Sequence, residues 1–160
     1  HEVDATFDDN ESEGLIYEWY YKNGKKNGVS KGWWINGMLK QIRTYKDGKL
    51  DGLWIYWYVS GQKRSEGKYK DEKNDGLWIY WFEDGGRGEV TYKNGKEDGL
   101  TTWWYENGQK RGDGTNKDGE RDGLWTDWYK NGQKEKEGTY KNGKEDGLFM
   151  KWYENGQKKE

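Results

Sequence analysis

The motif Asp-Gly-Leu-aromatic, or a close variant of it, returns along this chain at a nearly constant step. Its glycine recurs every 24 residues, apart from one step of 23. The positions of that glycine are Gly28, Gly52, Gly76, Gly99, Gly123 and Gly147. A fixed period of this size is the signature of a repeat protein. The chain is therefore a row of copies of one small unit.

The composition opposes a thick globular core. Of the 160 residues, 36% are charged, and the mean hydropathy is −1.49. Most of the apolar content comes from 12 Trp and 13 Tyr. Because each aromatic side chain buries about 150–250 Å², these residues favour a thin structure held together by rings.

Each copy predicts one β-hairpin. In the copy that starts at Gly123, an aromatic run over 124–129 ends at Asn131-Gly132, and a second run over 135–140 ends at Asn142-Gly143. Asn-Gly is the strongest short signal for a two-residue hairpin turn. The sequence therefore predicts an all-β fold, an elongated single-layer antiparallel β-meander of tandem hairpin repeats of about 24 residues.

A two-residue loop at Asn131-Gly132 sets the register of the hairpin. It pairs Tyr129 with Lys134, Trp128 with Glu135, Trp125 with Gly138, and Leu124 with Thr139. Because opposed residues share a face of the sheet, face one holds Leu124, Thr126 and Trp128, and face two holds Trp125, Tyr129 and Tyr140. An even period keeps each face from copy to copy. The copy of 23 residues, Gly76 to Asp98, therefore predicts a bulge or an odd-length loop near residues 85–88.

The two faces are predicted to have different roles. Face one recurs most strictly and is expected to be the structural seam. Its members are Leu53, Trp57, Leu77, Trp81, Leu100, Trp104, Leu124, Trp128, Leu148 and Trp152. Face two is expected to bind a partner, since Tyr and Trp are favoured in binding surfaces. Its members are Trp54, Tyr58, Tyr69, Trp78, Phe82, Tyr105, Trp125, Tyr129, Tyr140, Phe149 and Tyr153. The alternative is that the face-two rings only stack on one another. Gly67 and Gly138, opposite Trp54 and Trp125, are positions that a ring is expected to cover.

The domain prediction follows the regularity of the repeats. Residues 1–13 form an acidic tail that is solvated and partly disordered. Residues 14–160 form the repeat domain, with a degenerate cap over 14–51, regular repeats over 52–146 and a half repeat over 147–160.

The consensus Tyr-Lys-Asn-Gly-Lys-x-Asp-Gly-Leu-Trp-x-x-Trp-Tyr-x-Asn-Gly-Gln-Lys resembles the bacterial variant of the MORN repeat, typified by YwqK-family antitoxins of toxin–antitoxin systems. The resemblance covers residues 14–160 and departs from the pattern over 29–41. It implies a binding role with a toxin as partner. A second, weaker resemblance is to the choline- and glucan-binding repeats of bacterial surface proteins.

Few residues could carry catalysis or hold a metal. The only histidine is His1, and there is no cysteine, so neither a catalytic triad nor a zinc site is expected. The Asp residues before each motif glycine are expected to bond the turn backbone. We therefore predict no enzyme, no cofactor and no metal.

The distribution of charge bears on the class of partner. Lysine and glutamate are interspersed, which opposes nucleic-acid binding because that needs a basic stripe. No apolar run approaches the roughly 18 residues of a membrane span. Association with anionic headgroups is possible on this composition but not favoured.

Two functions are compatible with this pattern. The first is a non-enzymatic scaffold that binds a protein partner, with a toxin blocked sterically as the specific candidate. The second is a secreted or surface-displayed module that binds glycan or choline-like ligands or aids adhesion. The start at His1 and the acidic leader slightly favour an extracellular or envelope location. An open terminal strand would permit an end-to-end homodimer.

Overall fold

The computed structural model describes residues 3–7 and 16–159, with side chains from residue 17 onward. The chain divides into two compact units, His1–Asp75 and Gly76–Glu160. The described residues form strands and turns and contain no helix. Every strand pairing within a unit is antiparallel between successive strands, which confirms the predicted β-meander. Among the residues described, no helix has the length and apolar character needed to cross a membrane.

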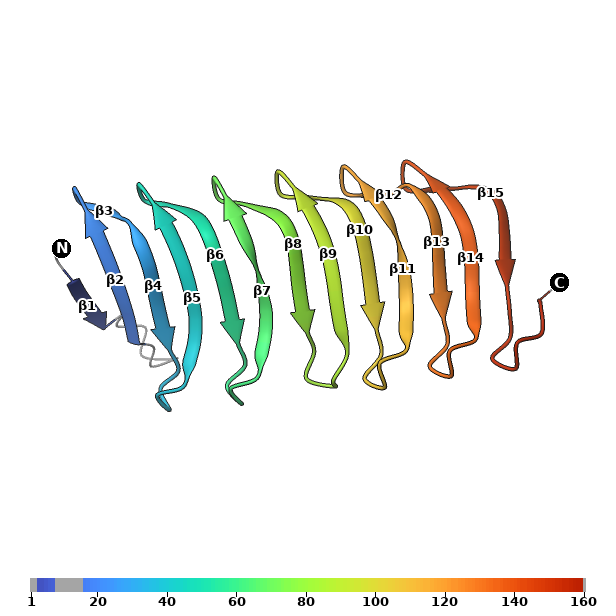
Figure 1. Ribbon diagram of the computed structural model, residues 1–160, viewed down its shortest axis with the longest axis horizontal. Coiled ribbons are helices and arrows are strands. Elements are labelled where there is room, and N and C mark those ends of the chain that lie inside the picture. The colour runs from blue at the N-terminus through green and yellow to red at the C-terminus, as the bar shows by residue number, and fades with distance from the viewer. Residues whose placement is uncertain (1–2, 8–15, 160) are drawn as a thin grey trace. The chain divides into compact units, whose positions relative to one another are not determined.

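The first unit is one antiparallel sheet (Figure 1). Its strand order is β1-β2-β4-β5-β6-β7, and the short strand β3 pairs with the end of β2. The strands are β1 (Val3–Phe7), β2 (Ile16–Lys22), β3 (Lys25–Lys26), β4 (Gly28–Trp33), β5 (Leu39–Lys46), β6 (Lys49–Trp57) and β7 (Lys63–Lys70).

The second unit repeats this arrangement. Its strand order is β8-β9-β10-β11-β13-β14-β15, and the short strand β12 pairs with β11. The strands are β8 (Lys73–Trp81, which begins just before the unit boundary), β9 (Arg87–Lys93), β10 (Lys96–Trp104), β11 (Lys110–Lys117), β12 (Glu120–Arg121), β13 (Gly123–Trp128), β14 (Lys134–Lys141) and β15 (Lys144–Lys151).

Two-residue turns close the end of the sheet nearest the Asp-Gly motifs, as predicted for Asn142-Gly143. Both residues of that turn have positive φ, 47° and 75°, and Lys141 pairs with Lys144. The N–H of Gly143 donates to the carbonyl of Arg121 at 3.0 Å. The turn therefore also ties its repeat to the preceding one.

The loop at Asn131-Gly132 differs from the prediction. Only Gly132 has a positive φ, 83°, and its N–H donates to the carbonyl of Tyr129 at 2.9 Å. The loop therefore has three residues, a type I turn followed by a left-handed glycine. The side chain of Asn131 holds it, because Oδ1 accepts the N–H of Gln133 at 2.9 Å and Nδ2 donates to the carbonyl of Glu154 at 2.8 Å.

The longer loop shifts the pairing next to it by one residue. Trp128 pairs with Lys134 rather than Glu135, and the N–H of Tyr129 donates to Gln133 rather than pairing with Lys134. A bulge then restores the predicted register. Beyond it, Trp125 pairs with Gly138 and Leu124 with Thr139, as predicted.

The 23-residue copy contains the predicted odd-length loop but not a bulge. Gly85 donates to the carbonyl of Phe82 at 3.0 Å, the same three-residue loop as in the other copies. Trp81 pairs with Arg87 and Tyr80 with Gly88, without a register shift. This copy is one residue shorter because the bulge of the other hairpins is missing, and its side chains keep their faces for that reason.

One two-residue turn has a non-glycine residue at its second position, and this supplies a test. Glu72 has φ 65° where the corresponding residue of another turn is Gly48. A residue with a side chain loses about 1–2 kcal/mol when its backbone adopts this left-handed conformation. Glycine avoids that cost, but it loses more conformational entropy on folding. We expect Glu72→Gly to raise the free energy of unfolding by about 0.5–1 kcal/mol, measured by urea denaturation. The control Lys70→Gly, in strand β7, should lower it, and equal effects of the two variants would contradict the assignment.

The two ends of the chain add detail to the predicted domains. Val3–Phe7, within the predicted tail, forms β1 and pairs with β2, with Val3 opposite Tyr20. This strand adds to the predicted tail, and residues 1–2 and 8–15 lie outside the described residues. After β15, Lys159 donates to the carbonyl of Lys151 at 2.8 Å. The divisions at 51/52 and 146/147 stay predictions, as does the homodimer.

Candidate binding surface

Face two is the packed face of the sheet. Three of its rings are almost inaccessible to solvent: Trp78 is 3% exposed, Trp125 5% and Tyr140 7%. In a single layer no second sheet covers these rings, so their burial must come from neighbours on the same face. Residues buried in this way do not offer a surface to a partner.

The rings are buried because they lie across glycines. The ring of Trp125 covers Gly114, where an added Cβ would meet a ring carbon at 2.2 Å, and Phe149 covers Gly138 at 2.3 Å. Trp125 and Gly138 are register partners as predicted, but Trp125 leans the other way. Its Nε1–H donates to the carbonyl of Thr115 at 2.9 Å. Each ring is therefore tied to the strand that precedes it.

Cations cover the exposed sides of the same rings. The guanidinium of Arg121 lies 4.2 Å from the ring centroid of Trp125, and that of Arg43 lies 4.5 Å from Trp54. The ammonium of Lys136 lies 4.8 Å from the ring of Phe149. Contacts of this kind contribute about 0.5–2 kcal/mol each, depending on exposure. They complete the packing of face two.

The tyrosines at the loop end of face two link successive repeats. The hydroxyl of Tyr105 donates to the carbonyl of Trp128 at 2.8 Å, and that of Tyr129 donates to Trp152 at 2.8 Å. Burial raises the pKa of Tyr105 above its usual value. These hydroxyls are therefore engaged within the sheet.

The structure brings the predicted partner-binding residues together on face two but leaves few of them open. Phe82 and Tyr153 are exposed. The other members, apart from the three buried rings, are half-buried: Trp54, Tyr58, Tyr69, Tyr105, Tyr129 and Phe149. The rings pair with one another, for example Trp54 with Tyr69 at 5.1 Å between centroids. This packing agrees with the alternative prediction for face two, in which its rings mainly stack on one another.

On face one, half-buried tryptophans alternate with cations. Arg87 lies 5.2 Å from the ring of Trp104, Lys110 lies 5.6 Å from Trp128, and Lys134 lies 5.8 Å from Trp152. Each cation also pairs with a neighbouring carboxylate, as Lys110 does with Asp113 at 2.5 Å. The ion pair with Lys134 lowers the pKa of Glu137. The remaining tryptophans of the predicted seam, Trp57 and Trp81, are half-buried too.

The leucines of face one are exposed, which contradicts their predicted place in a packed seam. Leu77 is 51% exposed, Leu100 70%, Leu124 58% and Leu148 74%, and Leu53 in the first unit is also exposed. They follow the motif glycine, whose positive φ (99° at Gly123, for example) bends the strand there. The tryptophans of face one lie nearer the loops than the leucines do, so each leucine stays open to solvent.

Threonines continue the line of leucines from strand to strand. Leu77 lies opposite Thr91, Leu100 opposite Thr115, and Leu124 opposite Thr139. We call this line the leucine row of the second unit; its members are Leu77, Thr91, Leu100, Thr115, Leu124, Thr139 and Leu148. The first unit has a shorter counterpart in Val29, Thr44 and Leu53.

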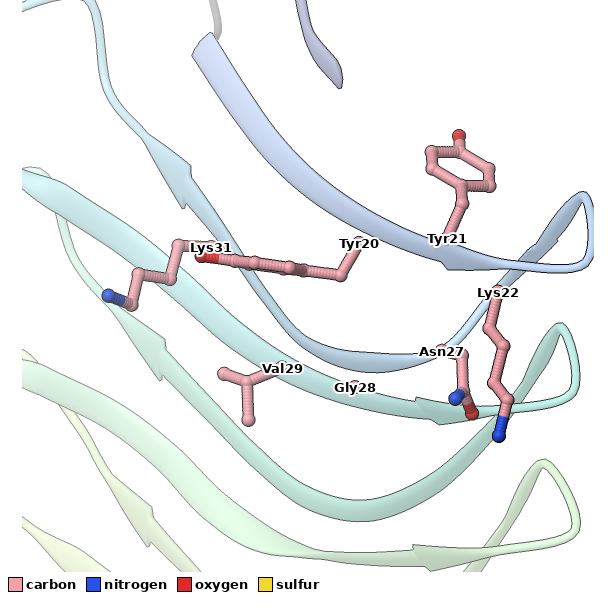
Figure 2. A pocket seen from close by; sticks show the side chains of 7 residues that line it. All are labelled: Tyr20, Tyr21, Lys22, Asn27, Gly28, Val29 and Lys31. Carbon is pink, nitrogen blue, oxygen red and sulfur yellow. The ribbon is translucent and has the colours of Figure 1, made fainter. Parts of the chain in front are cut away.

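A hollow of about 520 Å³ adjoins this counterpart in the first unit. It lies between β2 and β4 and is lined mainly by apolar surface. Figure 2 shows the ring of Tyr20 reaching toward Lys31 above Val29, while Tyr21 points away to the other side of the strand. The hydroxyl of Tyr20 donates to Glu18 at 2.5 Å, which fixes the ring.

Within residues 3–7 and 16–159, the structure gathers no group of three or more His, Asp or Glu side chains that could hold a metal ion. The Asp residues of the motif instead make hydrogen bonds and ion pairs with neighbouring strands and turns. Asp98 accepts the backbone N–H of Asp118 at 3.3 Å, and Asp122 pairs with Lys141 at 3.3 Å.

A family model described as MORN repeat variant matches residues 26–47, 50–71, 97–115 and 121–142. These stretches make up more than half of the chain, and each contains one hairpin of the sheet. The chain belongs to the MORN-repeat family. A search of curated proteins found no match to it.

The family matches refine the description of the repeats. The first MORN repeat includes residues 29–41, which we expected to depart from the pattern, so this stretch is a genuine member of the array. The four matches leave out residues 72–96, which contain both strands of the hairpin that lacks the bulge.

Proposed function

We propose that this MORN-repeat protein is a non-enzymatic scaffold that binds a protein partner through the leucine row. The observation that carries this proposal is the exposure of a leucine in each hairpin on one face, at 51–74% in the second unit. Aligned exposed apolar residues mark interaction surfaces more often than scattered ones do. Full burial of each leucine would contribute about 1.5–3 kcal/mol.

The spacing of the row favours a helical partner. Successive leucines lie two strands apart, which is about 9–10 Å. Along an α-helix, apolar residues seven positions apart recur at about 10.5 Å. An amphipathic helix lying across the strands would therefore place one apolar residue near each leucine, while the threonine methyl groups fill the positions between them.

The first unit has its own candidate contact for a protein partner, the hollow beside Val29. Binding surfaces concentrate their free energy in a few side chains that enter fitted pockets. The ring of Tyr20 and the side chain of Val29 give this hollow an apolar wall, and Lys31 stands at its edge.

The resemblance to antitoxin-associated repeats supports a finer proposal, in which the partner is a toxin that the scaffold neutralises by steric block. The chain would be co-expressed with the products of its neighbouring genes, and co-purification would be tested. We expect the double variant Leu100→Glu/Leu124→Glu to weaken binding about 100-fold or more, because two anchors are lost. Both sites are exposed, so the free energy of unfolding should stay within about 0.5 kcal/mol.

A matched control separates the two faces. Tyr153 is the most exposed ring of face two, and Tyr153→Glu should leave binding unchanged. Loss of the partner with Tyr153→Glu and retention with the leucine variant would show that face two is the binding face, as the sequence first suggested.

A further inference from the structure

At Asp127 a carboxylate replaces the ring that Tyr56, Tyr80 and Trp103 place at the same position of their repeats, and a second hollow lies there, in the second unit. One line of residues crosses the strands as Tyr80, Gly88, Trp103, Gly112 and Asp127. The ring of Trp103 covers Gly88, where a Cβ would meet a ring carbon at 2.2 Å. Over Gly112 the corresponding residue is Asp127, whose Oδ1 would lie 2.7 Å from such a Cβ. A short carboxylate stands where the pattern calls for a ring, and a hollow of about 560 Å³ remains.

Hydrogen bonds and ring stacking fix the walls of this hollow. Tyr105 is held by its hydrogen bond to Trp128. Trp125 is held by its hydrogen bond to Thr115. Trp103 stacks on Tyr80, with 6.3 Å between ring centroids. The hollow is therefore built by ordered rings around a glycine floor.

The charges around the hollow balance. Arg111 and Arg121 line it together with Asp127 and Glu135. The arginines lie against rings, 5.9 Å from Tyr105 and 4.2 Å from Trp125. Within the part of the chain that the structure describes, Asp127 makes no ion pair. Its carboxylate oxygens remain acceptors toward the hollow.

This combination selects the class of ligand. An anion would be repelled by the two carboxylates and an organic cation by the two guanidinium groups. A neutral ligand with hydrogen-bond donors, acceptors and an apolar face could bind the carboxylates, the guanidinium groups and the rings of this hollow at once. A pyranose ring has these properties, and the volume lies within the range of small-molecule sites.

We propose that the hollow at Gly112 binds a neutral pyranose ring, either a free sugar or one residue of a glycan. The C–H face of the sugar packs on Trp103, and neighbouring hydroxyls donate to Asp127. Arg111 donates to the ring or hydroxyl oxygens of the sugar. The site lies on the face opposite the leucine row, so it goes beyond the proposed protein-binding function and does not depend on it.

Titration of the full chain followed by tryptophan fluorescence tests this site. The probes are the methyl glycosides of glucose, galactose, mannose and N-acetylglucosamine, together with cellobiose, lactose and chitobiose. We expect at least one saturable change, with a Kd on the order of 1 mM for a monosaccharide. A disaccharide that binds about tenfold tighter identifies a glycan as the source, and equal affinity identifies a free sugar. No saturation by any probe overturns the proposal.

Variants of Asp127 locate the binding. Asp127→Asn keeps the shape of the side chain and should weaken binding about tenfold or more, because a charged acceptor is lost. Asp127→Tyr restores a ring over Gly112 and should abolish binding while the chain stays folded by circular dichroism. Asp113→Asn, on the same strand as Gly112 but on face one, is the control and should bind as wild type. Wild-type affinity in Asp127→Asn overturns the assignment.

Charged probes test the choice of ligand class. Choline and glucuronate should each bind more weakly than the best neutral sugar. Tighter binding of either one would show that the arginines and carboxylates do not offset each other, and a neutral sugar would no longer be the ligand.

Discussion

Replacement of Trp125 by alanine is expected to lower the free energy of unfolding by about 3–5 kcal/mol. The side chain is buried on face two, covers Gly114, and donates a hydrogen bond to Thr115. Its removal also takes away the nearer of the two rings that the guanidinium of Arg121 contacts, at 4.2 Å for Trp125 against 5.2 Å for Tyr140. Urea denaturation followed by circular dichroism measures the change.

Leu124→Ala is the matched control, because the two residues are adjacent on one strand and point to opposite faces. Leu124 is exposed, so its truncation should change the free energy of unfolding by no more than about 0.5 kcal/mol. A similar loss in both variants would mean that the two faces are packed equally, contrary to this account.

The second large effect is expected at the glycines beneath the rings. Gly114→Ala should lower the free energy of unfolding by about 1–3 kcal/mol, because the new Cβ has no room under the ring of Trp125. The φ of Gly114 is not positive, so the backbone conformation itself does not require glycine there. Strand propensity alone would therefore favour alanine, since glycine in a strand has no side chain to pack.

A double-mutant cycle assigns this loss to the ring. In the Trp125→Ala background the Gly114→Ala substitution should cost nothing or should stabilise, since the obstruction is gone. A loss that persists in that background would place the cost in the backbone rather than in ring cover.

The repeat period and the turn residues together were enough to predict the architecture. Spacing of the motif glycine and the turn residues gave the hairpins, and counting from Asn131-Gly132 gave the pairing of Trp125 with Gly138. The count succeeded away from the loop because two deviations cancel. The loop has one residue more than predicted, and the bulge absorbs it. Turn signals in a sequence do not show such compensation, because Asn-Gly serves both a two-residue turn and the end of a three-residue loop.

The sequence did not show which face is packed. In a sheet of one layer both faces carry apolar residues. The period of two therefore assigns each residue to a face but does not show which face is more buried. Burial here depends on the lean of each ring over a neighbouring glycine, as with Trp125 over Gly114. The strict recurrence of leucine suggested a structural role, yet the leucines are exposed.

The sugar site could have been suspected from the sequence in one respect. Asp127 takes the position that Tyr56, Tyr80 and Trp103 hold in three other repeats, while the first and last repeats carry Gly32 and Lys151 there. The alignment of repeats shows this difference, but not its consequence. The hollow forms only because Gly112 lies opposite Asp127, and that pairing depends on the bulged register.

Single cysteines test the central claim most directly, because the chain has no cysteine of its own. Leu100 is 70% exposed and its neighbour Thr101 is 2% exposed. Leu100→Cys should therefore react with a thiol reagent at nearly the rate of the unfolded chain, while Thr101→Cys should react at least about 100-fold more slowly. Equal rates, or faster labelling at residue 101, would contradict a sheet whose aromatic face is packed and whose leucine row is open.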